Sequence, residues 1–134
     1  MISRIHHINF VVHDLGQAAG RFAQLLDQPA GQIECLPQRG VELVRFKLGE
    51  VWLVLVHPID PESVPGKFLA QHGEGFFLMS WQVDDVRASA REVTARGFSM
   101  LQDEARQGLD GWRVMDLDPG ELFGINVQLV ETRE

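Results

Sequence analysis

Hydrophobic and polar positions alternate in short runs along most of this chain, and two longer stretches carry apolar residues at helical spacing. Residues 4–12 read RIHHINFVV, a strand pattern rich in β-branched and aromatic side chains. After Asp14, a candidate N-cap, apolar positions recur three and four residues apart and predict a helix that DQPAG, residues 27–31, ends. Further strands are predicted at 32–36, 41–48 and 51–56, with a hairpin turn at 48–50.

The second half repeats this order of elements. A strand at 76–83 precedes a helix that begins after Asp84-Asp85 and ends at Gly97. Strands are then predicted at 98–101, 111–117 and 124–130. With an offset of 71, IHHINFVVHDL (5–15) aligns on FFLMSWQVDDV (76–86), so His7 falls over Leu78 and Asp14 over Asp85. Each half therefore reads β-α-β-β-β, which is typical of a duplicated module.

The predicted fold class is α+β, with two βαβββ modules whose curved sheets enclose a shared cavity. The modules are expected at 1–58 and 76–134, joined by a connecting segment at 59–75 in which KFLAQ suggests one or two helical turns. At 134 residues, the two modules are expected to form one compact domain.

Composition narrows the classes of function. A formal charge of −7 argues against nucleic-acid binding, which depends on Lys and Arg neutralising phosphates. The longest apolar run, residues 51–56, is far too short to span a bilayer, and no signal-peptide pattern precedes the first strand. The lone Cys35 forms no internal disulfide, so a cytoplasmic protein is expected. Two interpretations remain for a group of basic residues. They bind a small anion, or they are solvated charges at the edge of a strand; the residues are Arg39, Arg45 and Lys47.

Several spaced motifs together resemble a known family. HHINFVV, VDDV and DP…GINVQLVE resemble the vicinal oxygen chelate superfamily, which includes glyoxalase I, extradiol dioxygenases and bleomycin-resistance proteins. Within it, LVLVHPIDPESVPGKFLAQHGEG followed by a strand and VDDV is most similar to methylmalonyl-CoA epimerases. The resemblance covers nearly the whole chain and implies the duplicated fold, a small organic or acyl-CoA substrate and a homodimer.

The resemblance also implies a divalent metal held by four strand residues, and here the sequence departs from the family. The matching positions are His7, Val54, Leu78 and Gln128. Val and Leu offer no lone pair, and one His with one neutral amide is too weak a donor set for a divalent ion. We therefore predict no metal and no other cofactor. A metal site would remain possible if His6 were a ligand, or if a strand were shifted in register and brought another ligand into place.

Strand periodicity predicts the lining of the cavity independently of the family. His7, Asn9 and Val11 share one face of their strand, and His6 and Ile8 share the other. In the other predicted strands, the same alternation places a few polar residues on one face. They are too few for a solvent-exposed surface and unusual for a packed core, so a lined pocket fits them better. The predicted ligand-binding residues are His7, Asn9, Trp52, Val54, Leu78, Ser80, Asn126 and Gln128.

In the epimerase interpretation, an acyl-CoA loses and regains its α-proton, and the enolate oxyanion needs hydrogen-bond donors. The predicted catalytic residues are His7 and, if its strand faces inward, Glu42. Gln128 stands where the family commonly has its base and cannot take a proton. We therefore predict a metal-free epimerase, isomerase or lyase. The alternatives are a metal-independent binding or sequestration protein of the bleomycin-resistance type, and a subunit with a vestigial cavity.

Each of these residues also has a structural interpretation. His7 is otherwise a core histidine bonded to a backbone carbonyl, and Gln128 and Asn126 are bonded to neighbouring strands. The tryptophans pack in the core or a dimer interface, and Asp116 and Asp118 shape a turn before Pro119. His57 and His72 are expected to be solvated. The sequence leaves open whether the two modules pair within one chain or across two.

Overall fold

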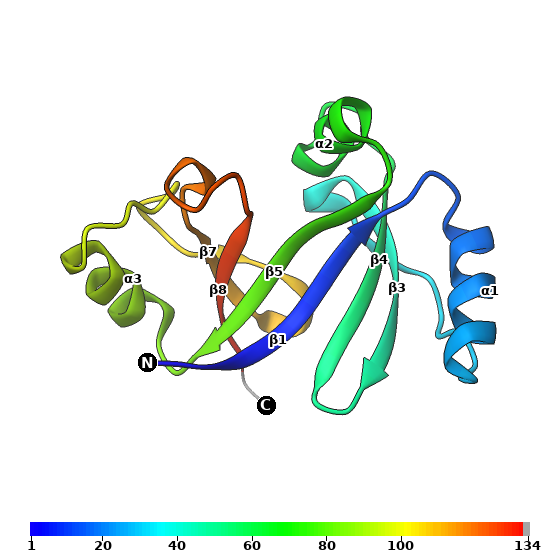
Figure 1. The fold of residues 1–134 in the computed structure, drawn as a ribbon, viewed down its shortest axis with the longest axis horizontal. Helices are drawn as coiled ribbons and strands as arrows, with labels where there is room; N and C mark the ends of the chain where they lie inside the picture. The colour runs from blue at the N-terminus through cyan, green and yellow to red at the C-terminus, as the bar shows by residue number, and fades with distance from the viewer. Residues whose placement is uncertain (133–134) are drawn as a thin grey trace. The chain divides into compact units, whose positions relative to one another are not determined.

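The computed structural model describes residues 1–132 and contains three α-helices and eight β-strands in that range (Figure 1). Two sets of β-α-β-β-β follow one another, with an additional helix between them, so the α+β class and the duplicated order of elements are confirmed. The first set is β1 (Ile2–Val11), α1 (Leu15–Leu26), β2 (Glu34–Leu36), β3 (Val41–Leu48) and β4 (Val51–Pro58). After α2 (Val64–His72) come β5 (Gly75–Val83), α3 (Val86–Ala95), β6 (Arg106–Gln107), β7 (Arg113–Asp116) and β8 (Val127–Glu131).

The chain divides into two compact units whose boundaries lie inside strands. Unit 1 comprises Met1–His7 together with the chain from Leu78 onward, and unit 2 comprises Ile8–Phe77. Unit 2 contains the strand order β2-β3-β4-β1, and unit 1 contains β1-β5-β8-β7-β6. The predicted module boundaries lie instead at the end of β4 and one residue inside β5, and the division into these modules stays a prediction.

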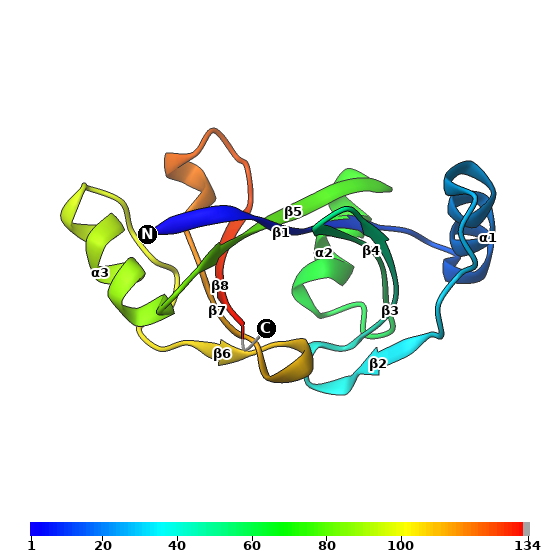
Figure 2. The same ribbon diagram turned by 90° about the horizontal axis from the view of Figure 1, so that it is seen from below.

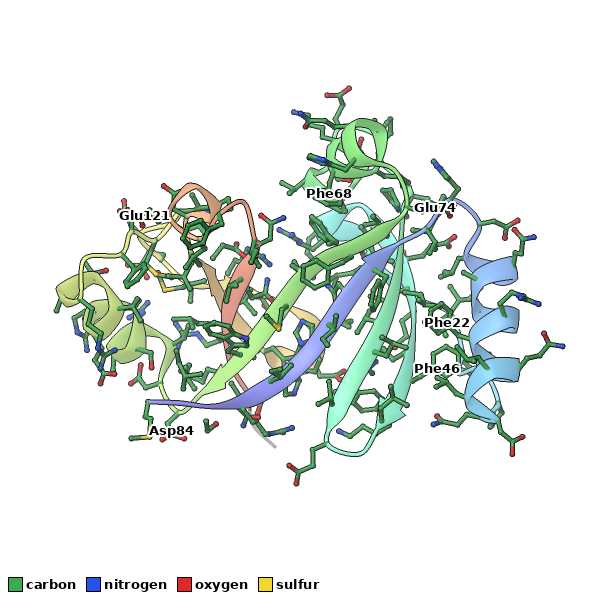
Figure 3. All side chains as sticks on the ribbon, viewed as in Figure 1. Phe22, Phe46, Phe68, Glu74, Asp84 and Glu121 are labelled. Carbon is green, nitrogen blue, oxygen red and sulfur yellow. The ribbon has the colours of Figure 1, made fainter. Side chains whose placement is uncertain are left out.

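In unit 2, α1 packs on β3 and β4 (Figure 1). Its apolar face meets buried strand residues that include Val44, Phe46 and Leu55. Figure 3 shows Phe22 of α1 facing Phe46, with 6.4 Å between the ring centroids. The predicted N-cap is confirmed, because Asp14 Oδ1 accepts a hydrogen bond from the Gln17 amide at 2.9 Å.

In unit 1, α3 packs on β7 and β8, and Figure 2 shows β8, β7 and β6 next to one another. The residues buried beneath α3 include Met115, Val127 and Leu129. Asp85 accepts a hydrogen bond from the Ala88 amide at 3.0 Å, so the two N-caps are related by the same offset of 71 as the aligned strands. Gly97 follows the helix with a φ of +99°.

The helix α2 is longer than the one or two turns expected from KFLAQ. Ser63 caps it, because its Oγ accepts a hydrogen bond from the Gly66 amide at 3.1 Å, and Pro65 fits the first turn. A Cβ atom at Gly66 would lie 2.5 Å from the carbonyl oxygen of Asp60, so only glycine fits. No helix within residues 1–132 has the length and apolar character needed to cross a bilayer.

The predicted strand at 98–101 is wrong. Only Met100 forms a bridge there, with Leu117, and the short strand that pairs with β7 is β6. The side chains of Phe98 and Leu101 are 37% and 57% exposed. Ser99 donates from its amide to the Glu121 carboxylate at 2.7 Å. The segment also makes two backbone hydrogen bonds around this bridge, from the Leu101 amide to the Asp116 carbonyl oxygen and from the Asp118 amide to the Ser99 carbonyl oxygen, but it does not form a continuous ladder.

Candidate functional site

Three polar residues form one row across adjacent strands of unit 1. Ser80 on β5 pairs with Gln128 on β8, and Gln128 pairs with Asp116 on β7. Directly paired residues project to the same face of a sheet, so the three side chains share one face. Ser80 and Gln128 are buried, with 0% and 5% exposure. A buried polar row of this kind needs internal hydrogen bonds.

Those hydrogen bonds occupy both ends of the Gln128 amide. Ser80 Oγ donates to Gln128 Oε1 at 2.9 Å. Gln128 Nε2 donates to Asp116 Oδ1 at 3.2 Å. The amide oxygen therefore faces a donor and the amide nitrogen faces a carboxylate, which fixes the orientation of Gln128. The prediction that Gln128 bonds neighbouring strands is confirmed.

Asp116 connects this row to an arginine. Arg106 Nη2 lies 3.0 Å and 3.3 Å from the two carboxylate oxygens. Gln102 Nε2 donates to Asp116 Oδ2, and the Asp116 amide donates to Gln102 Oε1, both at 2.8 Å. Asp116 was expected to shape a turn, and its place in this network shows that expectation to be wrong. Asp118 does shape the turn, because its carboxylate accepts from the Gly120 amide at 2.9 Å.

His6 and His7 form a second cluster with Trp112. Their Nδ1 atoms are 2.9 Å apart, so one ring donates to the other and the two tautomers are coupled. Both rings contact Trp112, edge-on for His6 at 4.6 Å and stacked for His7 at 5.2 Å between centroids. Strand alternation predicts that these adjacent residues lie on opposite faces of β1; both side chains are buried, and both rings nevertheless contact Trp112.

The histidine cluster and the polar row lie on the same face of unit 1. Trp112 packs with Val114 and Val130. By alternation, these valines share a face with Asp116 and Gln128, opposite the face that α3 covers. The site in unit 1 therefore combines a pair of imidazoles with a neutral amide whose partners are fixed.

The residues at the predicted metal-ligand positions do not fit a divalent metal. Val54 and Leu78 are buried aliphatic side chains with 3% and 6% exposure. The oxygen of Gln128 already accepts from Ser80. Within residues 1–132, no group of three or more His, Cys, Asp or Glu side chains is arranged to hold a metal ion.

Unit 2 does not place Glu42 on the face required of a catalytic base. Glu42 pairs with His57 on β4, and Val44 pairs with Leu55, which packs beneath α1. Glu42 therefore projects to the α1 face, whereas Val54 and Trp52 project to the opposite face. Glu42 was predicted to be catalytic only if its side chain faced inward. It does not, so the structure does not support Glu42 as a catalytic base.

Two predicted ligand-binding residues of unit 2 carry unsatisfied polar atoms. Asn9 Oδ1 and Trp52 Nε1 are buried and have no hydrogen-bond partner within the described residues. Buried polar atoms of this kind are uncommon and point to a missing partner. His57, expected to be solvated, is half-buried, and its Nδ1 lies 3.1 Å from the Val12 carbonyl oxygen.

A separate hollow in unit 1 lies between α3 and the segment 98–104. It contains none of the predicted site residues. Residues that line it include Arg87, Arg91, Phe98, Met100, Gln102 and Met115. Because Met115 projects to the α3 face, this hollow lies on the opposite face of the sheet from Gln128.

Sequence reasoning missed four residues of the site. Trp112 was assigned to core or dimer packing, Asp116 to a turn, and Gln102 and Arg106 received no role. Of these four residues, only Asp116 could have been found from the sequence. Once β7 and β8 are paired in register, Asp116 lies directly opposite Gln128. Gln102 and Arg106 reach Asp116 from a loop and a two-residue strand, which carry no periodic pattern.

Residues 6–115 match the family model described as the glyoxalase/bleomycin resistance protein/dioxygenase superfamily. Mitochondrial methylmalonyl-CoA epimerases are among the relatives. The mouse protein is 28% identical over 96% of this chain and 72% of its own length, and the human protein is 27% identical over 96% and 73%. A Streptomyces coelicolor methylmalonyl-CoA epimerase variant in complex with 2-nitronate-propionyl-CoA superimposes with a TM-score of 0.92 at 29% identity, covering 99% of this chain and 96% of that one.

Proposed function

Because the chain belongs to the glyoxalase/bleomycin resistance protein/dioxygenase superfamily, we propose that it binds an acyl-CoA and transfers the proton α to the thioester carbonyl without a divalent metal. The relatives named as methylmalonyl-CoA epimerases and the acyl-CoA analogue in the similar structure support the substrate class. The step breaks a C–H bond and leaves its electron pair in an enolate.

Metal independence rests on one observation, the donor set at the four predicted ligand positions, where Val54 and Leu78 have no lone pair and Gln128 supplies only a neutral amide. A metal ligand at this position would have to direct an oxygen lone pair to the ion. At Gln128 one lone pair of the amide oxygen accepts from Ser80, and the nitrogen donates to Asp116, so the amide keeps this orientation. Turning the amide over would break both bonds and bring its oxygen against a carboxylate.

His7 is the proposed proton acceptor. Its imidazole is 5% exposed and is held by contacts with His6 and Trp112. Imidazole is the commonest general base in enzymes, and a ring held in place avoids the entropic cost of ordering it. The second N–H of Gln128 Nε2, which the bond to Asp116 does not use, is a candidate donor to the enolate oxygen.

A single base restricts the outcome of the reaction. Epimerisation requires that a proton leaves one face of the α-carbon and arrives on the other. Gln128 cannot carry a proton, so His7 returns the proton to the face it left or to a conjugated carbon. The proposed chemistry is therefore α-proton exchange or isomerisation, with epimerisation disfavoured.

The test is exchange of α-protons with solvent deuterium. The protein is incubated in heavy water with propionyl-CoA and with methylmalonyl-CoA, and the α-position is followed by mass spectrometry. Exchange is expected with and without a chelator and should fall by at least about a hundredfold in His7→Ala. His13→Ala is the matched control, because His13 is exposed. Absence of exchange, or exchange that stops with the chelator and returns with metal, contradicts the proposal.

A second candidate function is metal-independent binding without turnover. The buried Val54 and Leu78 favour it, because aliphatic groups at ligand positions suit an apolar ligand. A ligand that binds only the folded state raises the melting temperature. Thermal stabilisation by acyl-CoA or aromatic compounds, with no deuterium incorporation, would support this candidate over the enzyme.

A further inference from the structure

The Asp116 carboxylate on β7 is fully occupied by hydrogen-bond donors of unit 1. Its Oδ1 accepts from Gln128 Nε2 at 3.2 Å and from Arg106 Nη2 at 3.3 Å. Its Oδ2 accepts from Gln102 Nε2 at 2.8 Å and from the same Arg106 nitrogen at 3.0 Å. A carboxylate offers about four lone-pair sites, and these contacts use all of them. Asp116 therefore has no lone pair left to take a proton from a ligand.

Arg106 is the cation that balances this carboxylate. It pairs directly with Val114 on β7, so its side chain shares the face of the sheet that carries Val114 and Asp116. Among residues 1–132, no other Lys or Arg side chain lies within ion-pair distance of Asp116. The side chains of Arg106 and Asp116 are 25% and 20% exposed, so water and salt screen their charges only in part.

Gln128 connects this charge pair to the proposed site of reaction. One N–H of its Nε2 donates to Asp116, and the other has no acceptor in the described part of the chain. In the proposed reaction, this second N–H donates to the enolate oxygen. The two hydrogen bonds share one nitrogen, so the Asp116 carboxylate lies no more than about 6 Å from the negative charge that develops on the enolate. Like charges this close repel each other, and an arginine on the carboxylate offsets the repulsion.

We propose that Arg106 is a positioning residue that acts on the ligand through Asp116 and Gln128. It holds the carboxylate that orients the Gln128 amide, and it compensates the negative charge of Asp116 so that the amide stabilises an enolate. The inference rests on the proposed function, because it takes the ligand to be an acyl thioester that loses its α-proton. Every residue that it uses belongs to unit 1.

The first test is deuterium exchange of propionyl-CoA, whose acyl group has no negative charge until the α-proton leaves. Arg106→Gln is expected to lower the exchange rate at saturating ligand at least about tenfold and to leave the affinity for propionyl-CoA unchanged. Arg106→Lys keeps the charge and should lose less. Arg87→Gln is the matched control, because Arg87 pairs with Glu104 at 2.7 Å and lies on α3, which covers the opposite face of the sheet.

A double variant separates charge compensation from a role in folding. Asp116→Asn removes the negative charge and keeps an oxygen that accepts from Gln128. In the Arg106→Gln background, it should therefore restore most of the lost exchange rate. If Arg106 served only to stabilise the fold, removing its partner as well would leave the rate low, and that result would overturn the proposal. Urea denaturation checks that each of the compared variants is folded.

Acetoacetyl-CoA tests the same charge balance without turnover, because it forms a stable enolate that absorbs in the near ultraviolet. On the unmodified protein, the enolate should form at a lower pH than in free solution. In Arg106→Gln, its formation should move up by about one pH unit, a tenfold change in the ionisation constant of the bound ligand. Arg87→Gln should not change it.

The two measurements distinguish failure of this inference from failure of the proposed function. If the enolate responds to Arg106→Gln but the unmodified protein exchanges no α-proton, the proposed function fails and the role of Arg106 stands. If the α-proton exchanges but neither the rate nor the enolate responds to Arg106→Gln, the proposed function stands and the role of Arg106 is refuted. If the protein neither exchanges the proton nor stabilises the enolate, both fail.

Discussion

Gln128 donates a hydrogen bond to Asp116, with 3.2 Å between the amide nitrogen and the carboxylate oxygen. The carboxylate is held in turn by Arg106 and Gln102. A neutral donor is therefore what the surroundings of residue 128 require. The arrangement gives a physical reason why a carboxylate does not suit this position, independent of any comparison with relatives.

Replacing that donor by an acid should destabilise the protein. Gln128→Glu removes the N–H and places a second buried carboxylate against Asp116, so we expect a loss of about 1–3 kcal/mol in unfolding free energy at neutral pH. Chemical denaturation measures it. Gln107→Glu, an exposed position on β6, is the matched control and should change stability little. Equal losses in both variants would contradict the assigned role of Gln128.

Ser80 should matter through its hydroxyl. Ser80→Ala leaves the buried oxygen of Gln128 without its donor, which we expect to cost about 1–3 kcal/mol. Ser3, whose Oγ donates to the Gln82 carbonyl at the surface, gives the control variant Ser3→Ala, with a smaller loss expected. A Ser80→Ala protein as stable as the original would mean that the hydrogen bond contributes nothing net.

Restoring family ligands should create a metal site in unit 1. The double variant Leu78→His, Gln128→Glu adds an imidazole and a carboxylate on the face that carries Ser80, beside His7. We expect it to bind Co²⁺ or Zn²⁺ and to gain thermal stability in their presence. Elemental analysis after gel filtration measures the metal content. The unmodified protein is the control, and failure of the double variant to retain metal would show that His7 is not oriented toward these positions.

The helix cap of α1 gives a prediction on stability alone. Asp14→Ala removes the acceptor of the Gln17 amide and should cost about 1 kcal/mol. Asp14→Asn keeps an acceptor and should cost less. Denaturation of the two variants measures the difference, and equal losses would show that the carboxylate charge rather than the hydrogen bond matters.

Asp85 predicts how acid affects stability. The hydrogen bond from the Ala88 amide, helped by the Arg87 amide and by the charges of Arg91 and Arg113, lowers the pKa of the Asp85 carboxyl below its usual 3.8 despite partial desolvation. A group with a lowered folded pKa stabilises the protein above pH 3.8, and that contribution is lost as the pH falls through the folded value. The stability advantage over Asp85→Asn should therefore shrink between about pH 5 and about pH 2. An advantage that does not change over this range would contradict the pKa shift.

The helices and most strands follow from local pattern. The boundaries of α1 and β3 agree with the predicted ranges, because an N-cap, apolar spacing and a hairpin turn act locally there. The predicted strand at 98–101 was wrong because this segment pairs with residues 116–118 at one isolated bridge only, and periodicity does not reveal how far such a pairing extends. The shared 71-residue offset identified both caps and both long strands.

The site was predictable only in part. The aliphatic side chains of Val54 and Leu78 at two predicted ligand positions are visible in the sequence. The meeting of His6 and His7 was not, because strict alternation separates adjacent residues and only the folded strand shows them together against Trp112. Arg106 and Asp116 form an ion pair through tertiary contacts that single-residue reasoning does not reach.

The division of β1 between His7 and Ile8 has a consequence for any attempt to dissect the molecule. Suppose that the gene is divided in the loop before β5. The N-terminal fragment then carries the first seven residues, which belong to unit 1, and the C-terminal fragment carries the rest of unit 1 without them. We expect that neither fragment is stable when expressed alone, and that the two regain structure only when they are produced together.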